Sequence, residues 1–130
     1  MPTITLLYAG ILGIISLVLA MGAASARGPA GVSIGTGDDP KLLVANRRHG
    51  NFIEWVPMAL LLMALLEANG VGATATHVFG IVLTIARICH PLGLDTEKMT
   101  HPLRFVGAAG TFLLTAVMSV WAIVLFFTMP

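Results

Sequence analysis

The chain has 130 residues, of which 57% are hydrophobic and 10% are charged. A soluble domain carries roughly 25% charged residues to cover its surface, so this composition excludes an ordinary soluble fold and indicates an integral membrane protein. The formal net charge of +1 provides no basic surface, so no nucleic-acid partner is expected. The single Cys89 excludes an intrachain disulfide and is expected to be a small packing residue.

The first expected helix covers residues 3–26, a stretch with no charged residue. About 20 apolar residues span a hydrocarbon core roughly 30 Å thick, so this stretch is long enough to cross a membrane. Its first positive charge, Arg27, follows the apolar run, which is the wrong polarity for a secretory signal. The Gly28-Pro29 pair and the glycine-rich residues 31–40 predict a loop after it.

Three more helices are expected, so the fold is predicted to be an all-α, four-helix transmembrane bundle in a single domain. Their expected ranges are 41–68, 73–94 and 101–128. The Asp39-Pro40 pair is typical of a helix start. Thr100-His101-Pro102 repeats this pattern before the last helix.

The basic residues indicate how the bundle is oriented. All seven Lys and Arg residues lie near the connection between the first two helices or the connection between the last two. The N-terminus, the turn between the second and third helices and the C-terminus carry none. The positive-inside rule therefore predicts that the two longer connections face the cytoplasm and that both termini face outward.

A polar stripe runs down the second expected helix. Arg47, Asn51 and Glu54 occupy positions i, i+4 and i+7 and so share one helical face. An ionisable group within a membrane is costly, so Glu54 is expected to face the bundle interior and to pair with a cation. Arg87 on the third helix is the candidate partner, with His90 one turn later. An ion pair that only joins helices remains an alternative.

Each of the four helices brings a cation to this layer, including Arg27 at the end of the first helix and Arg104 at the start of the fourth. Several guanidiniums suit a ligand with more than one carboxylate. A neighbouring carboxylate suits a ligand amine, and an arginine beside a thiol favours the thiolate. Two carboxylates, an amine and a thiol describe glutathione. Simple anchoring of the arginines to lipid headgroups is the alternative. The four histidines lack close ligand spacing, so no metal site is expected.

The residues of this layer also match a known family. The matching positions are Arg47, Asn51, Glu54, Trp55 and Pro57 on the second helix, Ile85-Ala86-Arg87 and His90 on the third, and Pro102-Leu103-Arg104 on the fourth. Over its whole length the chain resembles the membrane-associated proteins in eicosanoid and glutathione metabolism, the MAPEG family, and most of all its small bacterial branch. The resemblance implies a homotrimer in the bacterial inner membrane, with glutathione bound between neighbouring subunits near the cytoplasmic side.

The resemblance also implies roles for individual residues. Those implied to hold glutathione as a co-substrate are Arg27, Arg47, Asn51, Glu54, Arg87 and His90. Glu54 is expected to face the glutathione amine, and Arg27 to close the pocket from the adjacent subunit. Arg104 matches the arginine that stabilises the thiolate in transferase members, and is therefore the expected catalytic residue.

The function that the resemblance implies is a glutathione S-transferase or peroxidase that acts on lipophilic electrophiles arriving from the bilayer. Two departures favour an alternative, a non-catalytic lipid- or glutathione-binding scaffold on the same fold. Leu94 stands where transferase members carry a tyrosine, and Phe105 stands where one branch has a catalytic serine. An exporter in which Glu54 exchanges protons is a third possibility, but the arginines around Glu54 argue against it.

Overall fold

The computed structural model describes residues 1–98 and 100–128, which form four helices. The helices are α1 (Thr3–Ala30), α2 (Pro40–Ala68), α3 (Ala73–Leu92) and α4 (Pro102–Thr128). All four are long and apolar enough to cross a membrane, which confirms the expected all-α membrane bundle. The homotrimer stays a prediction, because the structure holds one chain.

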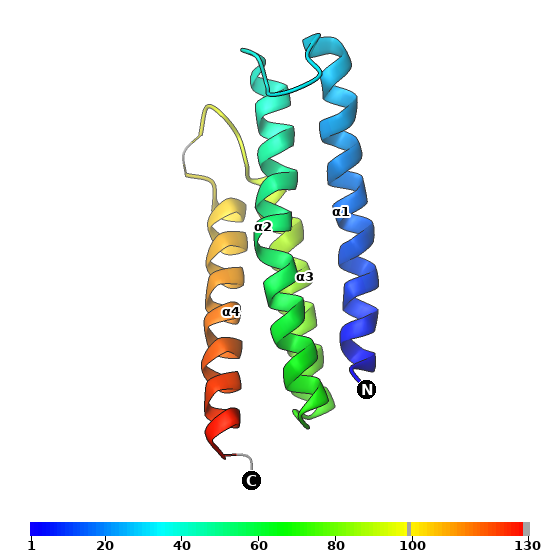
Figure 1. Ribbon diagram of the computed structural model, residues 1–130. Helices are drawn as coiled ribbons and strands as arrows, with labels where there is room; N and C mark the ends of the chain where they lie inside the picture. The colour runs from blue at the N-terminus through cyan, green and yellow to red at the C-terminus, as the bar shows by residue number, and fades with distance from the viewer. Residues whose placement is uncertain (99, 129–130) are drawn as a thin grey trace.

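The helices run side by side along one direction (Figure 1). α2 and α3 form the centre, with α1 packed against both on one side and α4 packed against both on the other. Within the described residues α1 and α4 make no contact with each other. The two longer connections lie at one end of the bundle, and the α2–α3 turn lies at the other (Figure 1). We call the end with the two longer connections the cationic end, because the basic residues of the chain lie toward it.

α1 is one turn longer than the sequence predicts. The expected end at residue 26 is wrong, since the helix continues through Pro29 to Ala30. A proline beyond the first turn removes an N–H donor and crowds the carbonyl of residue i−4, yet here the helix continues for one residue past it. Gly31 then ends the helix, because its φ of 65° lies in the left-handed region that glycine adopts without strain.

α3 ends at Leu92 and not at residue 94 as predicted. The N–H of Gly93 is already bonded to the carbonyl oxygens of Cys89 and His90, at 3.2 Å each, and the chain then leaves the helix. The difference affects the site, because Leu94 now belongs to the α3–α4 connection. There its carbonyl oxygen accepts a hydrogen bond from Arg48 at 3.0 Å.

Glycine allows α3 and α4 to approach closely at the cationic end. A Cβ atom at Gly107 of α4 would lie 2.6 Å from the Cβ atom of His90 on α3, which is closer than real Cβ atoms approach. Gly93 packs in the same way against the backbone of Arg104. These contacts place His90 and Arg104 at the same level of the bundle.

Polar contacts at the opposite end of the bundle join α1 to its neighbours. Glu67, at the end of α2, accepts the N–H groups of Ile4 and Thr5 at 2.8 Å each and the Thr5 hydroxyl at 2.7 Å. A carboxylate in this position satisfies N–H groups that have no partner within α1 and complements the positive end of the helix dipole. Tyr8, the only tyrosine of the chain, bonds to His77 at 3.1 Å. It therefore lies far from the cationic end.

Candidate functional site

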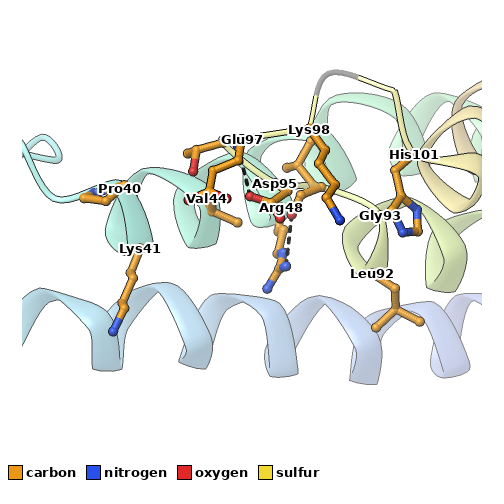
Figure 2. A pocket seen from close by; sticks show the side chains of 12 residues that line it. Pro40, Lys41, Val44, Arg48, Leu92, Gly93, Asp95, Glu97, Lys98 and His101 are labelled. Atoms are coloured by element: carbon orange, nitrogen blue, oxygen red, sulfur yellow. Dashed lines mark hydrogen bonds between the residues drawn. The ribbon is translucent and has the colours of Figure 1, made fainter.

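Two cavities open at the cationic end, separated by the α3–α4 connection. The first, which we call the α1-side cavity, measures about 510 Å³ and is lined by Lys41, Arg48 and Lys98 among others (Figure 2). The second, which we call the α4-side cavity, measures about 500 Å³ and lies between α2, the end of α3 and the start of α4. Residues 94–96 line both cavities and so form the wall between them.

The α4-side cavity brings together residues that the sequence predicted as a site. Arg47, Asn51, His90 and Arg104 all line it. They come from three different helices, and the close approach of α3 to α4 at Gly107 brings the last two together. Four residues of the predicted layer therefore line one cavity, while Arg27, Glu54 and Arg87 do not line it.

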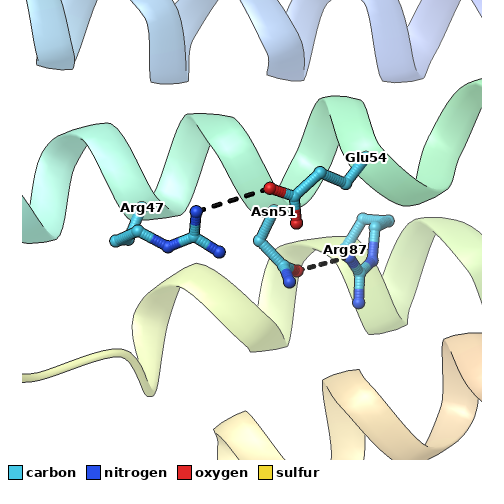
Figure 3. A network of polar contacts seen from close by, with 4 residues as sticks. All are labelled: Arg47, Asn51, Glu54 and Arg87. Atoms are coloured by element: carbon cyan, nitrogen blue, oxygen red, sulfur yellow. Dashed lines mark hydrogen bonds and ion pairs between the residues drawn. The ribbon is translucent and has the colours of Figure 1, made fainter.

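The α2 part of the cluster has the predicted arrangement on one helical face (Figure 3). The guanidinium of Arg47 pairs with the Glu54 carboxylate at 3.4 Å. The two side chains are 55% and 50% exposed, so this pair lies on the outer face of the bundle. The expectation that Glu54 faces the interior of its own bundle is wrong for this chain.

Arg87 does not pair with Glu54 as the sequence predicted. It donates instead to the side-chain oxygen of Asn51 at 3.0 Å and to the backbone oxygen of Gly107 at 2.9 Å (Figure 3). Only 2% of Arg87 is exposed. Arg87 thus links α3 to α2 and to α4 by two hydrogen bonds made inside the bundle.

The bond from Arg87 fixes the orientation of the Asn51 amide. A guanidinium carries only donors, so the oxygen of the amide must face Arg87. The NH₂ group of Asn51 is then left as a donor beside the α4-side cavity, which Asn51 lines. This donor suits a carboxylate oxygen of a ligand.

Sequence reasoning missed a carboxylate in the wall of this cavity. Asp95 lines it, and its carboxylate accepts the backbone N–H of Glu97 at 3.0 Å. That hydrogen bond is the main reason why the pKa of Asp95 lies below its usual value, with the nearby charges of Lys98 and Arg48 lowering it further. Asp95 is in a loop without helical spacing, so no periodic signal in the sequence could have placed it.

Arg27 lies apart from the cluster in this chain. Its guanidinium donates to the carbonyl oxygens of Ser33 and Gly35, at 3.2 and 3.0 Å, and so holds the α1–α2 connection. A role at the pocket of an adjacent subunit stays a prediction. Among residues 1–98 and 100–128, no three His, Cys, Asp or Glu side chains form a group that could hold a metal ion.

Replacing Arg87 with lysine should destabilise the bundle. An ammonium group keeps the charge, but it lacks the planar fork that reaches Asn51 and Gly107 together. One of the two hydrogen bonds made by this buried charge should be lost, so we expect Arg87→Lys to lower the free energy of unfolding by about 2 kcal/mol, measured by thermal unfolding in detergent. The matched control is Arg47→Lys, which changes an exposed arginine and should cost about 0.5 kcal/mol or less. Equal losses in the two variants would contradict this role of Arg87.

Comparison with known proteins identifies the family of this chain. The sequence profile of the MAPEG family matches residues 5–124. The chain is also 40% identical over 62 residues to the inner membrane protein YecN of Escherichia coli K12, and equally to YecN of Escherichia coli O6:H1. The alignment covers 48% of this chain and 47% of each relative, which is about half of their length. No solved structure shows a significant match. Since the family profile spans all four helices and every residue of the cluster, the chain belongs to the MAPEG family.

Proposed function

We propose that this protein binds glutathione in the α4-side cavity and uses it as a co-substrate for lipophilic electrophiles. The observation that carries the proposal is the convergence of Arg47, Asn51 and Arg104 on one cavity of about 500 Å³. Small-molecule pockets typically measure about 300–1,000 Å³, so the space suits a tripeptide. The donors of Arg47 and Asn51 suit the carboxylates of glutathione, and the guanidinium of Arg104 suits its thiolate.

The remaining groups of glutathione also have counterparts. Asp95 is a carboxylate in the cavity wall that can accept the glutathione amine. Glu54 lies beside the cavity, on the exposed face of α2 and paired with Arg47. Charged side chains that are half exposed on a membrane-spanning helix, as Arg47 and Glu54 are, are costly. A neighbouring subunit over that face would remove the cost, so a homotrimer with a shared pocket is part of the proposal.

Arg104 is the proposed catalytic residue. It lines the α4-side cavity and also a mainly apolar cavity of about 550 Å³ that includes Phe105 and Ala108. A glutathione sulfur beside Arg104 would be held as the thiolate, because a nearby guanidinium favours the anion. The thiolate would attack a lipophilic electrophile in the apolar cavity, forming a carbon–sulfur bond as the carbon–leaving group bond breaks. The reaction would be accelerated by electrostatic stabilisation of the thiolate and by its proximity to the electrophile.

The proposed location is the bacterial inner membrane. The relatives that match carry that location in their name. The cationic end, with both longer connections, would face the cytoplasm according to the positive-inside rule. Glutathione would then enter from the cytoplasm and the electrophile from the bilayer.

One observation favours a second candidate, a non-catalytic scaffold that binds lipid or glutathione. Leu94 lines the α4-side cavity at a position where transferase members carry a tyrosine. The only tyrosine of this chain, Tyr8, is bonded to His77 at the other end of the bundle. The thiolate would then depend on Arg104 alone.

Replacing Arg47 should weaken glutathione binding. We expect Arg47→Ala to raise the Kd for glutathione about 10- to 100-fold, because the loss of one hydrogen bond to a charged group weakens binding by that factor. Calorimetric titration of the detergent-solubilised protein measures this Kd. Lys41→Ala is the matched control, because Lys41 is a cation on the same helix that lines the α1-side cavity. Wild-type protein that does not bind glutathione would refute the proposed function.

Replacing Arg104 should separate binding from catalysis. We expect Arg104→Ala to keep glutathione binding within a few-fold, to lose the ultraviolet absorbance of the bound thiolate, and to lower conjugation of an aryl halide about 100-fold. Unchanged conjugation would remove Arg104 from the mechanism. Wild-type protein that binds glutathione but shows neither thiolate absorbance nor conjugation would establish the scaffold instead.

A further inference from the structure

The α1-side cavity is not used by the proposed reaction. It lies above the end of α3, between the first turns of α2 and the α3–α4 connection. The side chains of Lys41 and Arg48 point from α2 toward α1, and Lys98 reaches into the same space from the connection (Figure 2). Three cations from two segments of the chain therefore surround one cavity of about 510 Å³.

The charges around this cavity leave one positive charge in excess. Asp95 and Glu97 also line it, so two carboxylates stand against the three cations. The carboxylate of Asp95 is already bonded to the Glu97 N–H at 3.0 Å, which keeps it ionised. The remaining charge suits a ligand that carries a single negative charge.

Arg48 brings a guanidinium group to this cavity, which it lines. One of its terminal nitrogens donates to the Leu94 carbonyl oxygen at 3.0 Å, which holds the side chain in place. Phosphate oxygens are strong acceptors for guanidinium groups.

An apolar track leads away from the same cavity. Leu92 lines the cavity and is 66% exposed. Ile88, Ile85 and Ile81 follow it at helical spacing on one face of α3, and each is about half exposed. Among residues 1–98 and 100–128, α1 and α4 do not contact each other, and this face of α3 stays open. One molecule with a charged head and a long apolar chain could occupy both the cavity and the track.

We propose that the α1-side cavity binds the phosphate of an anionic phospholipid headgroup, with an acyl chain of the same lipid lying along the α3 track. Lys41, Arg48 and Lys98 hold the phosphate, and the two carboxylates limit the ligand to one negative charge. The lipid packs beside residues 94–96, which form the wall between this cavity and the α4-side cavity.

Native mass spectrometry of the full chain in detergent tests the proposal. The probes are phosphatidylglycerol, phosphatidylcholine with the same acyl chains, and inorganic phosphate. We expect several-fold more retained phosphatidylglycerol than phosphatidylcholine, and about a five-fold loss in Lys98→Ala, the effect of one cation near an anionic headgroup. Lys98 is exposed in a loop, so this variant should fold as the wild type does.

The matched control is Arg47→Ala, which removes a cation from the other cavity and should retain phosphatidylglycerol fully. Replacing an isoleucine of the track, as in Ile85→Asn, should also reduce retention. Equal retention of the two lipids, or equal losses in Lys98→Ala and Arg47→Ala, would overturn the site. Displacement of the lipid by inorganic phosphate at equal concentration would assign the cavity to a soluble phosphate and overturn the lipid proposal.

Discussion

The buried guanidinium of Arg87 organises the cationic end of the bundle. It sits on α3 and donates to Asn51 on α2 and to the Gly107 carbonyl on α4, so one side chain sets the spacing of three helices. A buried charge is destabilising unless it is hydrogen-bonded, and both terminal nitrogens of Arg87 have acceptors. Asn51 lines the α4-side cavity. Gly107 packs against His90, which also lines this cavity. The interaction that stabilises this end therefore also sets the shape of the candidate site.

The α3–α4 connection divides the space at the cationic end into two cavities. Residues 94–96 separate two cavities of similar size, and Arg48 holds this wall by its bond to the Leu94 carbonyl oxygen. The two sides differ in chemistry. The α4-side cavity combines Asn51, Arg47 and Arg104, and Arg104 also lines a mainly apolar cavity. The α1-side cavity combines Lys41, Arg48 and Lys98 with an open apolar face of α3.

Much of this arrangement could be predicted from the sequence, because it depends on periodicity and composition. The four spans follow from apolar length, and the common face of Arg47, Asn51 and Glu54 follows from helical spacing. The partner of Arg87 could not be predicted, since spacing along one helix does not determine how a neighbouring helix is rotated. Asp95 was missed for a similar reason: it lies in a loop, and only the fold brings it to the cavity. The end of α1 was missed because the Gly28-Pro29 pair is typical of a loop, whereas the helix continues through it to Ala30.

We propose that the polar layer at one end of this membrane bundle is a glutathione pocket. The most direct test is an experimental structure of the protein purified and imaged in millimolar glutathione. We expect density for glutathione in the α4-side cavity, with a carboxylate at the Asn51 NH₂ group and the sulfur beside Arg104. An empty α4-side cavity, or glutathione bound away from these residues, would contradict it.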